Sequence, residues 1–558
     1  MSIQELKVHS VVGLLVFLAP GWECAPRAQD TPQTQVIEIG SRRELFVDEF
    51  LIDRLAGGAE LRLHHPRPRE LALVHDAPWE GTGSGYHSVF QDGDRYRMYY
   101  KAWHLDVQQG KLNTGAHPLF CCYAESDDGI HWGKPDLGIV EFQGSTANNI
   151  TIASGQAGSL KIDAGHPAVF KDENPDVAAD AKYKAFVRSA GPRGLIPLKS
   201  PDGLHWTPMS DGPVITEGAF DSQNLAFWDP VLGQYRAYWR IFTAGTTTEK
   251  VWKPAGIRAI RTATSPDFLH WSDPVDLTYV DSPDEELYTN QVKPYHRAPH
   301  LLIGFPTRYV DRGWSDSMKA LPELEHRELR ASSTQRYGTA LTEGLLMASR
   351  DGVRFKRWNE AFLRPGIERP GTWSYGQQYI AWHVVETQSD LEGAPNELSL
   401  YAGESYWTGK SSALRRYTLR LDGFVSVNAP MSGGELVTCP MTFSGDELRL
   451  NFSSSAVGGI RVELQDKSGA PIPGFALNDC QDVFGDSVDR VVTWTEGAAT
   501  GGSLGANAPT SFGQGSDSSE QSPGGADVSR LAGRPVRIRF VLKDADLFAF
   551  QFADAAKR

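Results

Sequence analysis

The sequence predicts an all-β protein in which a five-bladed β-propeller is followed by a C-terminal β-sandwich. Short runs with alternating apolar and polar side chains recur along the chain, whereas long helical patterns are scarce. A turn motif built on Asp-Gly returns at intervals of tens of residues, which is typical of a radial array of small sheets. The composition changes beyond residue 427 while strand patterns continue, which indicates a second β domain.

The turn motif reads Ser-Asp-Asp-Gly-Ile-His-Trp at 126–132 and returns at 200–206, 265–271 and 349–355, with a weak copy at 421–424. An Asp-Gly pair takes the positive backbone angles of a tight hairpin, and the Ser or Asp side chain can bond the turn amides. The closing Trp or Phe can wedge between neighbouring sheets. We therefore interpret four aspartates as turn formers: Asp128, Asp202, Asp267 and Asp351.

Strand-like runs fill five blades in chain order. The first blade has runs at 86–91, 96–101 and 120–125 and a short strand after Trp132. The later blades have runs at 167–170, 183–188 and 195–199, at 224–228, 235–240 and 257–262, at 291–295, 301–305 and 344–348, and at 379–385, 398–402 and 414–420. A polar insertion at about 311–337 interrupts the fourth blade.

These patterns predict three segments. Residues 1–28 read as a secretory signal, because basic residues precede the apolar run 11–18 and small residues follow it. Residues 29–430 form the propeller and residues 431–558 the β-sandwich, with a Gly/Ser-rich loop at 497–525. We therefore expect a secreted or periplasmic protein with no integral membrane segment after signal cleavage.

The net charge and the cysteines limit which binding partners, disulfides and metal sites we expect. A formal net charge of −14 argues against nucleic acid or an anionic membrane as the main partner. Cys439 and Cys480 fall in the same region and could pair, although free thiols are favoured. Cys121 and Cys122 point to opposite faces of a strand, which disfavours a metal site there. We expect no cofactor; a structural Ca²⁺ held by carbonyls in the propeller channel stays open.

One rim of the propeller gathers polar and aromatic residues. Because strands within a blade run antiparallel, the starts of inner strands, the ends of second strands and the starts of third strands share the rim opposite the Asp-Gly turns. Residues at inner-strand starts are Glu80, Tyr86, His87, Asp163, His166, Asp221, Gln223, Asn224, Glu286, Tyr288, Asn290, Trp373 and Tyr375. Those from the other strands are Trp103, His104, Arg188, Arg240, Arg258, Arg308, Glu343 and Glu404.

Aromatic rings that pack on sugars and charged forks that bond hydroxyls or carboxylates favour a carbohydrate ligand at this rim. Glycoside cleavage needs one protonated carboxyl group and a second that acts as base or nucleophile. The leading catalytic candidates are Asp221, Glu286 and Glu343. The expected substrate-binding residues are His87, Trp103, His166, Arg188, Asn224, Arg240, Arg258, Tyr288, Asn290, Arg308, Trp373 and Tyr375. Each could instead belong to a merely polar rim, and Asp229 reads as a turn residue.

Several segments together resemble a family of secreted bacterial proteins that is common in planctomycetes. They are Phe-Val-Asp-Glu-Phe-Leu-Ile at 46–52, the turn at 126–132, Phe-Asp-Ser-Gln-Asn at 220–224, Tyr-His-Arg-Ala-Pro-His at 295–300 and the run at 540–548. That family is similar to the five-bladed glycoside hydrolases of families 32, 43 and 68. The resemblance implies a propeller hydrolase, but only the architecture extends to the characterised enzymes.

The catalytic motifs of family 32 do not transfer residue by residue. The nearest counterparts of its Trp-Met-Asn-Asp-Pro, Arg-Asp-Pro and Glu-Cys motifs are Asp48, Trp228-Asp-Pro230 and Glu286, and none matches. We therefore expect a glycoside hydrolase that acts on an oligo- or polysaccharide through a carboxylate pair. The glycan, the linkage and the stereochemical outcome stay open. The alternatives are a non-catalytic carbohydrate-binding propeller and a sialidase-like or polysaccharide-lyase enzyme that uses Tyr288 or Tyr375 on an acidic sugar.

Overall fold

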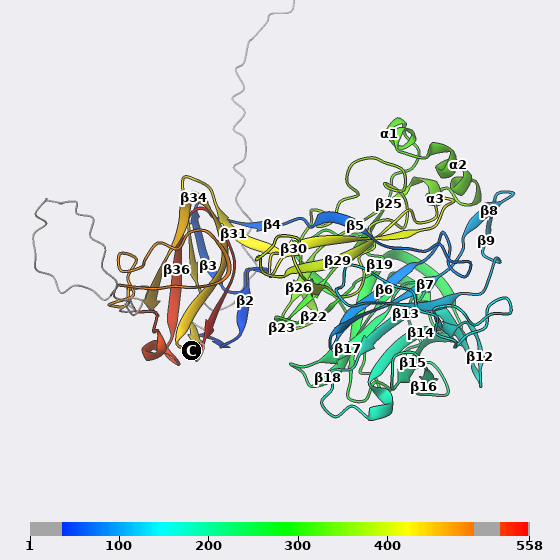
Figure 1. Ribbon diagram of the computed structural model, residues 1–558, viewed down its shortest axis with the longest axis horizontal. Helices are drawn as coiled ribbons and strands as arrows, with labels where there is room; N and C mark the ends of the chain where they lie inside the picture. The colour runs from blue at the N-terminus through cyan, green and yellow to red at the C-terminus, as the bar shows by residue number, and fades with distance from the viewer. Residues whose placement is uncertain (1–35, 496–524, 556–558) are drawn as a thin grey trace, which may run out of the picture. The chain divides into compact units, whose positions relative to one another are not determined.

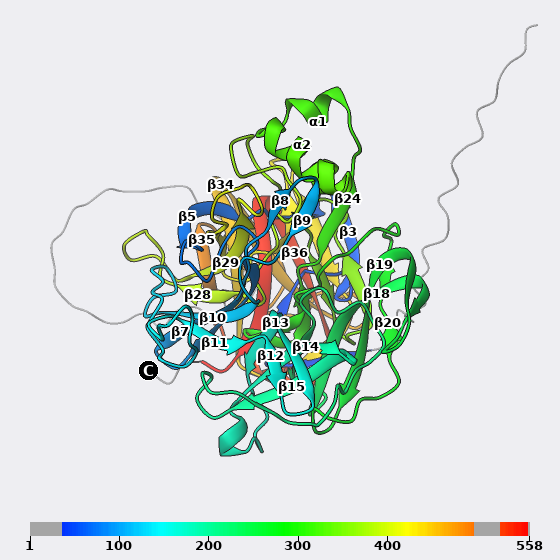
Figure 2. The ribbon, with the colours of Figure 1, turned by 90° about the vertical axis from the view of Figure 1, so that its right-hand side faces the viewer.

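The computed structural model describes residues 36–495 and 525–555. The predicted signal and almost all of the predicted Gly/Ser-rich loop lie outside the described residues. Within them the fold is nearly all β, and five small sheets form the blades of a propeller (Figures 1 and 2). The predicted all-β propeller is confirmed. None of the helices in the described part of the chain is long and apolar enough to cross a membrane.

The blades follow one another in chain order. Blade one contains β6 (Gly85–Asp92), β7 (Arg95–Ala102), β10 (Phe120–Ser126) and β11 (Ile150–Ala153). Blade two contains β12 (Gly155–Ala157), β13 (Leu160–Lys171), β14 (Tyr183–Gly191), β15 (Arg193–Ser200) and β16 (Thr207–Pro208). Blade three contains β17 (Leu225–Asp229), β18 (Gln234–Thr247), β19 (Trp252–Ser265) and β20 (Val275–Asp276).

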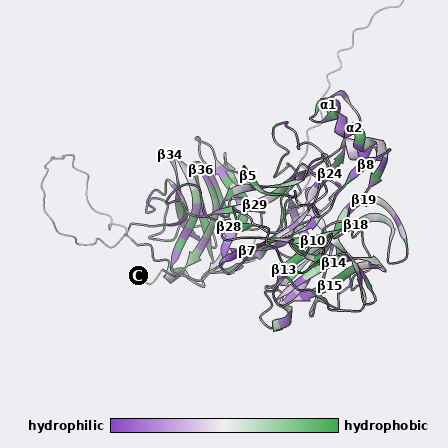
Figure 3. Ribbon diagram, turned by 45° about the vertical axis from the view of Figure 1, so that its right-hand side comes forward, coloured by the Kyte–Doolittle hydropathy of each residue, from purple (hydrophilic) through white to green (hydrophobic). Residues whose placement is uncertain are grey.

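Blade four contains β21 (Thr278–Val280), β22 (Lys293–Tyr295), β23 (Ala298–Gly304), β26 (Met347–Ser349) and β27 (Arg354–Arg357). The insertion in this blade forms the hairpin β24 (Thr307–Asp311) and β25 (Ala340–Gly344), with α1 (Asp316–Ala320), α2 (Leu324–Ser333) and α3 (Arg336–Thr339) between its strands. Hydrophobic and hydrophilic residues are mixed along the blade strands (Figure 3), as expected for strands whose side chains alternate between faces.

An N-terminal strand closes the ring. Blade five contains β28 (Val385–Thr387), β29 (Glu397–Glu404), β30 (Ala413–Arg420) and β5 (Arg67–Val74). Strand β5 pairs antiparallel with β30, so the fifth sheet joins residues from both ends of the propeller sequence. The sequence analysis found only three strands for this blade, because Arg-Pro-Arg-Glu at 67–70 reads as a loop and its partner lies more than 300 residues away along the chain.

The strands that precede β5 in the described residues belong to the other β unit, not to the propeller. That unit contains β1 (Ile37–Gly40), β2 (Arg43–Leu45), β3 (Ile52–Gly57), β4 (Glu60–Leu63), β31 (Val425–Ala429), β32 (Gly434–Thr438), β33 (Met441–Phe443), β34 (Glu447–Asp466), β35 (Asp486–Val491) and β36 (Val536–Ala553). These ten strands form one branched sheet around a shared core. The predicted propeller range of 29–430 is therefore too wide at both ends, because β1 to β4 and β31 belong to this second sheet. Cys439 and Cys480 are free thiols.

The repeated turns behave as their sequence predicts. In the first copy, Oδ1 of Asp128 accepts hydrogen bonds from the amides of Ile130 at 2.7 Å and His131 at 2.8 Å, and Oδ2 lies 2.7 Å from the His131 ring. Partial burial alone would raise the pKa of Asp128, but the His131 ring and these amides hold it well below its usual value. Asp202, Asp267 and Asp351 make the same amide contacts, so their interpretation as turn formers is confirmed.

The aromatic residue that closes each turn packs on the preceding blade. Trp132 of blade one meets Tyr401 of blade five, with ring centroids 5.8 Å apart. The other pairs are Trp206 with Tyr99 at 6.3 Å, Trp271 with Phe186 at 5.8 Å and Phe355 with Tyr238 at 6.2 Å. Each such edge-to-face or tilted pair adds about 0.5–1.5 kcal/mol beyond burial, so the repeated motif joins neighbouring blades as well as reversing the chain.

We expect Gly352→Ala in the fourth turn to destabilise the protein by about 2–4 kcal/mol. Gly352 has φ = 80°, and an added Cβ would overlap the guanidinium of Arg236 and lie 2.8 Å from the Tyr238 hydroxyl. The matched control is Gly366→Ala, which has φ = 77° but no atom within 4 Å of the new Cβ, so that it pays only about 1 kcal/mol of backbone strain. Urea unfolding measures both; equal losses would contradict the packing argument.

Candidate functional site

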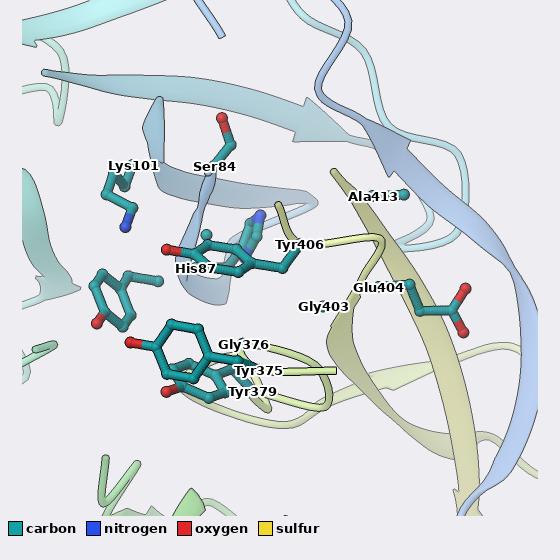
Figure 4. A pocket seen from close by; sticks show the side chains of 12 residues that line it. Ser84, His87, Lys101, Tyr375, Gly376, Tyr379, Gly403, Glu404, Tyr406 and Ala413 are labelled. Carbon is teal, nitrogen blue, oxygen red and sulfur yellow. The ribbon is translucent and has the colours of Figure 1, made fainter. Parts of the chain in front are cut away.

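A small cavity opens at the rim where inner strands begin, opposite the Asp-Gly turns. Its walls come from the first and fifth blades and include Tyr86, together with Lys101, Tyr375, Tyr379 and Tyr406 (Figure 4). Tyr86 has φ = 53°, a left-handed conformation that costs a residue with a Cβ about 1–2 kcal/mol. Such strain concentrates at functional sites, where the surrounding structure holds it.

Lys101 is the penultimate residue of strand β7 and lines the cavity. Its side chain is almost fully buried, with a residue exposure of 2%. The ammonium lies 4.5 Å from the ring centroid of Tyr86, 4.7 Å from that of Trp103 and 5.7 Å from that of Tyr406. Burial lowers the pKa of Lys101 to about 7, against the opposing effect of Asp163.

Asp221 lies on the rim at the start of the third blade. It forms an ion pair with Arg240, which is buried, whereas the Asp221 side chain is 46% exposed and therefore open to a ligand. Desolvation favours protonation of Asp221, but Arg240, His166 and Arg188 together lower its pKa, so the group is ionised at neutral pH. Its other oxygen, Oδ2, accepts no hydrogen bond from the described residues.

The second blade adds three interacting side chains, those of Asp163, His166 and Arg188. Asp163 forms an ion pair with Arg188, and its Oδ1 lies 3.4 Å from Nδ1 of His166. Burial raises the pKa of Asp163, but His166 and Arg188 bring it well below its usual value. Burial also lowers the pKa of His166, whose ring lies 5.6 Å from that of Tyr86. Two predicted binding residues, His166 and Arg188, thus belong to the same electrostatic cluster as Asp221.

Glu286 is held by the neighbouring strand β19. Its Oε2 accepts hydrogen bonds from the backbone amide of Arg258 at 2.8 Å and from Nη1 of Arg258 at 2.9 Å, while Oε1 has no partner among the described residues. Arg258 and Arg240 both contact the ring of Tyr288, at 5.3 Å and 4.5 Å from its centroid. Tyr288 therefore connects the ion pairs of Asp221 and Glu286.

Glu343 lies on the other face of the hairpin β24–β25. It pairs with Arg308 at 2.6 Å, and Arg308 also binds Glu285 at 3.0 Å. The next residue, Tyr309, packs in the aromatic cluster around Tyr288 with a centroid distance of 6.3 Å. Adjacent residues of a strand point to opposite faces, so Arg308 and Glu343 point away from that cluster. The structure does not bring Glu343 together with Asp221 and Glu286.

Other predicted binding residues have structural partners. Asn224 donates to the carbonyls of Phe220 and Ser222 and accepts from the Arg240 amide, so it braces the loop that carries Asp221. Asn290 accepts from the Val292 amide at 3.2 Å. A ring nitrogen of His87 lies 3.0 Å from a ring nitrogen of His75. The indole of Trp373 donates to the Gly366 carbonyl, and the hydroxyl of Tyr375 donates to that of Tyr288. Trp103 contributes its ring beside Lys101.

Two glutamines occupy the axis below the cavity. The amide of Gln223 donates to the carbonyls of Tyr86 at 3.0 Å and Pro167 at 3.1 Å. Gln291 in turn donates to Oε1 of Gln223 at 2.8 Å. The carbonyls of Tyr86 and Pro167 are of the kind that could hold a Ca²⁺ in the channel, and here both accept hydrogen bonds from the side-chain amide of Gln223.

The sequence analysis missed Lys101, Tyr379 and Tyr406 as members of the site. Lys101 stands two residues before Trp103, so strand alternation places both on the same face, and this signal was present in the sequence. Tyr379 begins the strand predicted at 379–385, whereas the structure places it in the segment that precedes β28. Tyr406 follows β29 in a loop whose course no local pattern predicts.

The comparisons with known proteins found similarity of structure but no match of sequence. No family model and no curated protein matches the sequence. Among solved structures, one described as a glycoside hydrolase is 12% identical, with a TM-score of 0.39, over 63% of this chain and 92% of its own. An N-acetylgalactosamine deacetylase from F. plautii is 12% identical with a TM-score of 0.40, over 65% and 96% of the two chains. The RS223 β-xylosidase is 11% identical with a TM-score of 0.35, over 64% and 97%. At these scores the likeness says nothing about the reaction of this chain.

Proposed function

We propose that the rim cavity and its surroundings form the active site of a glycoside hydrolase that cleaves an oligo- or polysaccharide, with Asp221 and Glu286 as the carboxyl pair. One observation carries this proposal. Two carboxylates, each with one oxygen that has no partner among the described residues, are joined through Arg240 and Arg258 to the same ring, Tyr288. Tyr375 and Tyr379, which border the cavity and are partly exposed, offer aromatic surface on which a sugar outside the cavity can pack.

The two carboxyl groups differ in surroundings, and this difference supports a division of roles between them. Asp221 is ionised and partly exposed, so it suits the base or nucleophile. Glu286 is then the acid: its free Oε1 would carry the proton to the leaving glycosidic oxygen. The basic and apolar pattern before residue 28 supports a secreted or periplasmic enzyme, where polysaccharides are encountered.

A tyrosine nucleophile or base is less well supported. The Tyr375 hydroxyl lies 3.3 Å from that of Tyr288. Burial and the neighbouring tyrosines raise the pKa of Tyr375 well above its ordinary value, so it is protonated at neutral pH. The sialidase-like alternative therefore lacks an activated tyrosine at this position.

The test is product release from a panel of neutral and acidic oligosaccharides by the wild type and three isosteric variants. We expect Asp221→Asn and Glu286→Gln to lose roughly 100- to 10,000-fold in kcat/KM, the usual worth of a positioned acid or base. Glu343→Gln, which removes a similar charge from the opposite face of β25, should keep most of the activity. Full activity in both of the first two variants, with melting temperatures unchanged, would refute the assignment. Binding of sugars without cleavage would favour a non-catalytic carbohydrate-binding protein.

A further inference from the structure

The floor of the cavity holds a cation that has no anionic partner. The ammonium of Lys101 makes no hydrogen bond and no ion pair within the described residues, and its recorded contacts are with aromatic rings. Its amino group points into the cavity (Figure 4). Burying a charged group without a hydrogen-bonded partner costs several kcal/mol, so a fold that keeps Lys101 there needs a reason beyond packing.

The rest of the lining also supplies hydroxyl donors, and it offers no unpaired carboxylate among the described residues. The hydroxyl of Tyr379 is buried and has no hydrogen-bond partner in the part of the chain that the structure describes. Burial and neighbouring tyrosines raise the pKa values of Tyr379 and Tyr406 well above neutral pH, so both hydroxyls keep their protons. The one carboxylate of the lining, Glu404, points away from the cavity and is already paired with Arg369 and Arg415 (Figure 4). The cavity thus suits a group that is rich in acceptors.

Size limits which group can enter. The free volume is about 30 Å³, room for roughly two water molecules. A pyranose ring does not fit in that space, whereas a planar carboxylate is of comparable size. The ring that bears the carboxylate would remain outside, on the side of the exposed Asp221.

We propose that Lys101 and Tyr379 bind the carboxylate of an acidic sugar, so that the substrate of the proposed hydrolase carries such a sugar next to the bond that is cleaved. The proposal rests on the proposed function for its place in a reaction, but the binding of the carboxylate itself can be tested without cleavage. A charge-assisted hydrogen bond from an ammonium to a carboxylate is about twice as strong as a neutral one, which makes this contact selective against uncharged sugars.

The proposal predicts a pH dependence of binding. With a pKa of about 7 in the free protein, Lys101 loses its charge as the pH rises above neutral, and affinity for a carboxylate should fall over the same range. The titratable and charged groups around it do not reverse this trend. They are Asp163 and Arg188 of blade two, the neutral imidazoles His87 and His166, and the protonated Tyr86 and Tyr406.

Calorimetric titration of the whole protein with D-galacturonate, D-glucuronate, N-acetylneuraminate and neutral D-galactose tests the proposal. We expect the wild type to prefer at least one acidic sugar, and Lys101→Met to weaken its binding roughly tenfold or more without affecting galactose. Tyr379→Phe should weaken it several-fold, and Lys101→Arg should retain part of the preference if the methionine variant does not fold. Lys199→Met, which removes a surface lysine paired with Asp180, is the matched control and should bind like the wild type.

The possible results of these experiments distinguish a failure of the carboxylate site from a failure of the proposed hydrolase. Acidic-sugar binding that depends on Lys101, in a protein that cleaves no glycan of the panel, supports the carboxylate site and refutes the hydrolase. Cleavage of neutral glycans that is indifferent to Lys101→Met supports the hydrolase and overturns the carboxylate site. A wild type that does not bind any acidic sugar more tightly than galactose also overturns it. The uronates and N-acetylneuraminate distinguish two sources of the same carboxylate.

Discussion

Lys101→Met should make the protein more stable, and the gain should be largest below pH 7. The wild-type ammonium is buried with only aromatic rings around it, and its folded pKa of about 7 lies well below the 10.5 of an exposed lysine. That difference corresponds to a penalty on the order of 2–4 kcal/mol for the charged form, once the relaxation of a buried site is allowed for. Methionine has a similar shape and no charge, so it avoids the penalty.

The sign of the pH dependence follows from proton binding. Between pH 7 and 10.5 the unfolded lysine holds a proton that the folded one has lost, so wild-type stability rises with pH over this window and the full penalty applies below it. The difference between Lys101→Met and wild type should therefore be greatest at pH 6 and smaller at pH 9. Urea unfolding at both pH values measures it. A variant that is less stable than wild type at pH 6 would show that Lys101 contributes to folding rather than to binding.

Arg240→Met should move the acid limb of the pH–activity profile to higher pH by about one unit, which is about a tenfold loss of kcat/KM on that limb. Arg240 is the principal group that lowers the pKa of Asp221 against the effect of burial. Without the guanidinium, Asp221 binds a proton at higher pH and is no longer available as base or nucleophile in mildly acidic solution. The methionine retains much of the unbranched stem beside Tyr288.

The comparison that isolates this effect is Arg308→Met, which removes an arginine from Glu343 on the face of the hairpin that points away from the aromatic cluster. Its profile should keep the wild-type shape. The acid limb of kcat/KM, measured across the pH range with each variant, decides the matter, because it reports the pKa of the free enzyme's essential base. An unshifted limb in Arg240→Met would mean that Asp221 is not that base.

Local chemistry made the propeller predictable from the sequence. An Asp that bonds two amides of its own turn, and a Trp or Phe four residues later, recur in the first four blades, as the turns of Asp128 and Asp202 show. Strand β5 escaped prediction because it is defined by a partner more than 300 residues away, and because its Arg-Pro start lacks alternation. The same non-local pairing assigns residues 37–63 to the second β unit.

The sequence was enough to predict on which rim of the propeller the site lies, but it was less informative about the role of each residue there. Inner-strand starts placed Tyr86, Asp221 and Tyr288 correctly near one another, since the direction of the strands is enough for that. Which carboxylates lie in one cluster depends on ion pairs made by side chains from other strands, and this could not be read from the sequence. Glu343 is the example, because it pairs with Arg308, which also binds Glu285, on the face of the hairpin that points away from Tyr288.

The most direct test of the central claim is a crystal structure of the Asp221→Asn variant with an oligosaccharide that contains uronic acid. We predict that a glycosidic oxygen lies within reach of both position 221 and Glu286, and that the carboxylate of the adjoining sugar lies beside Lys101. A saccharide bound away from both carboxyl positions, for example at the opposite channel mouth near Lys293 and His383, would contradict the claim that this rim is the active site.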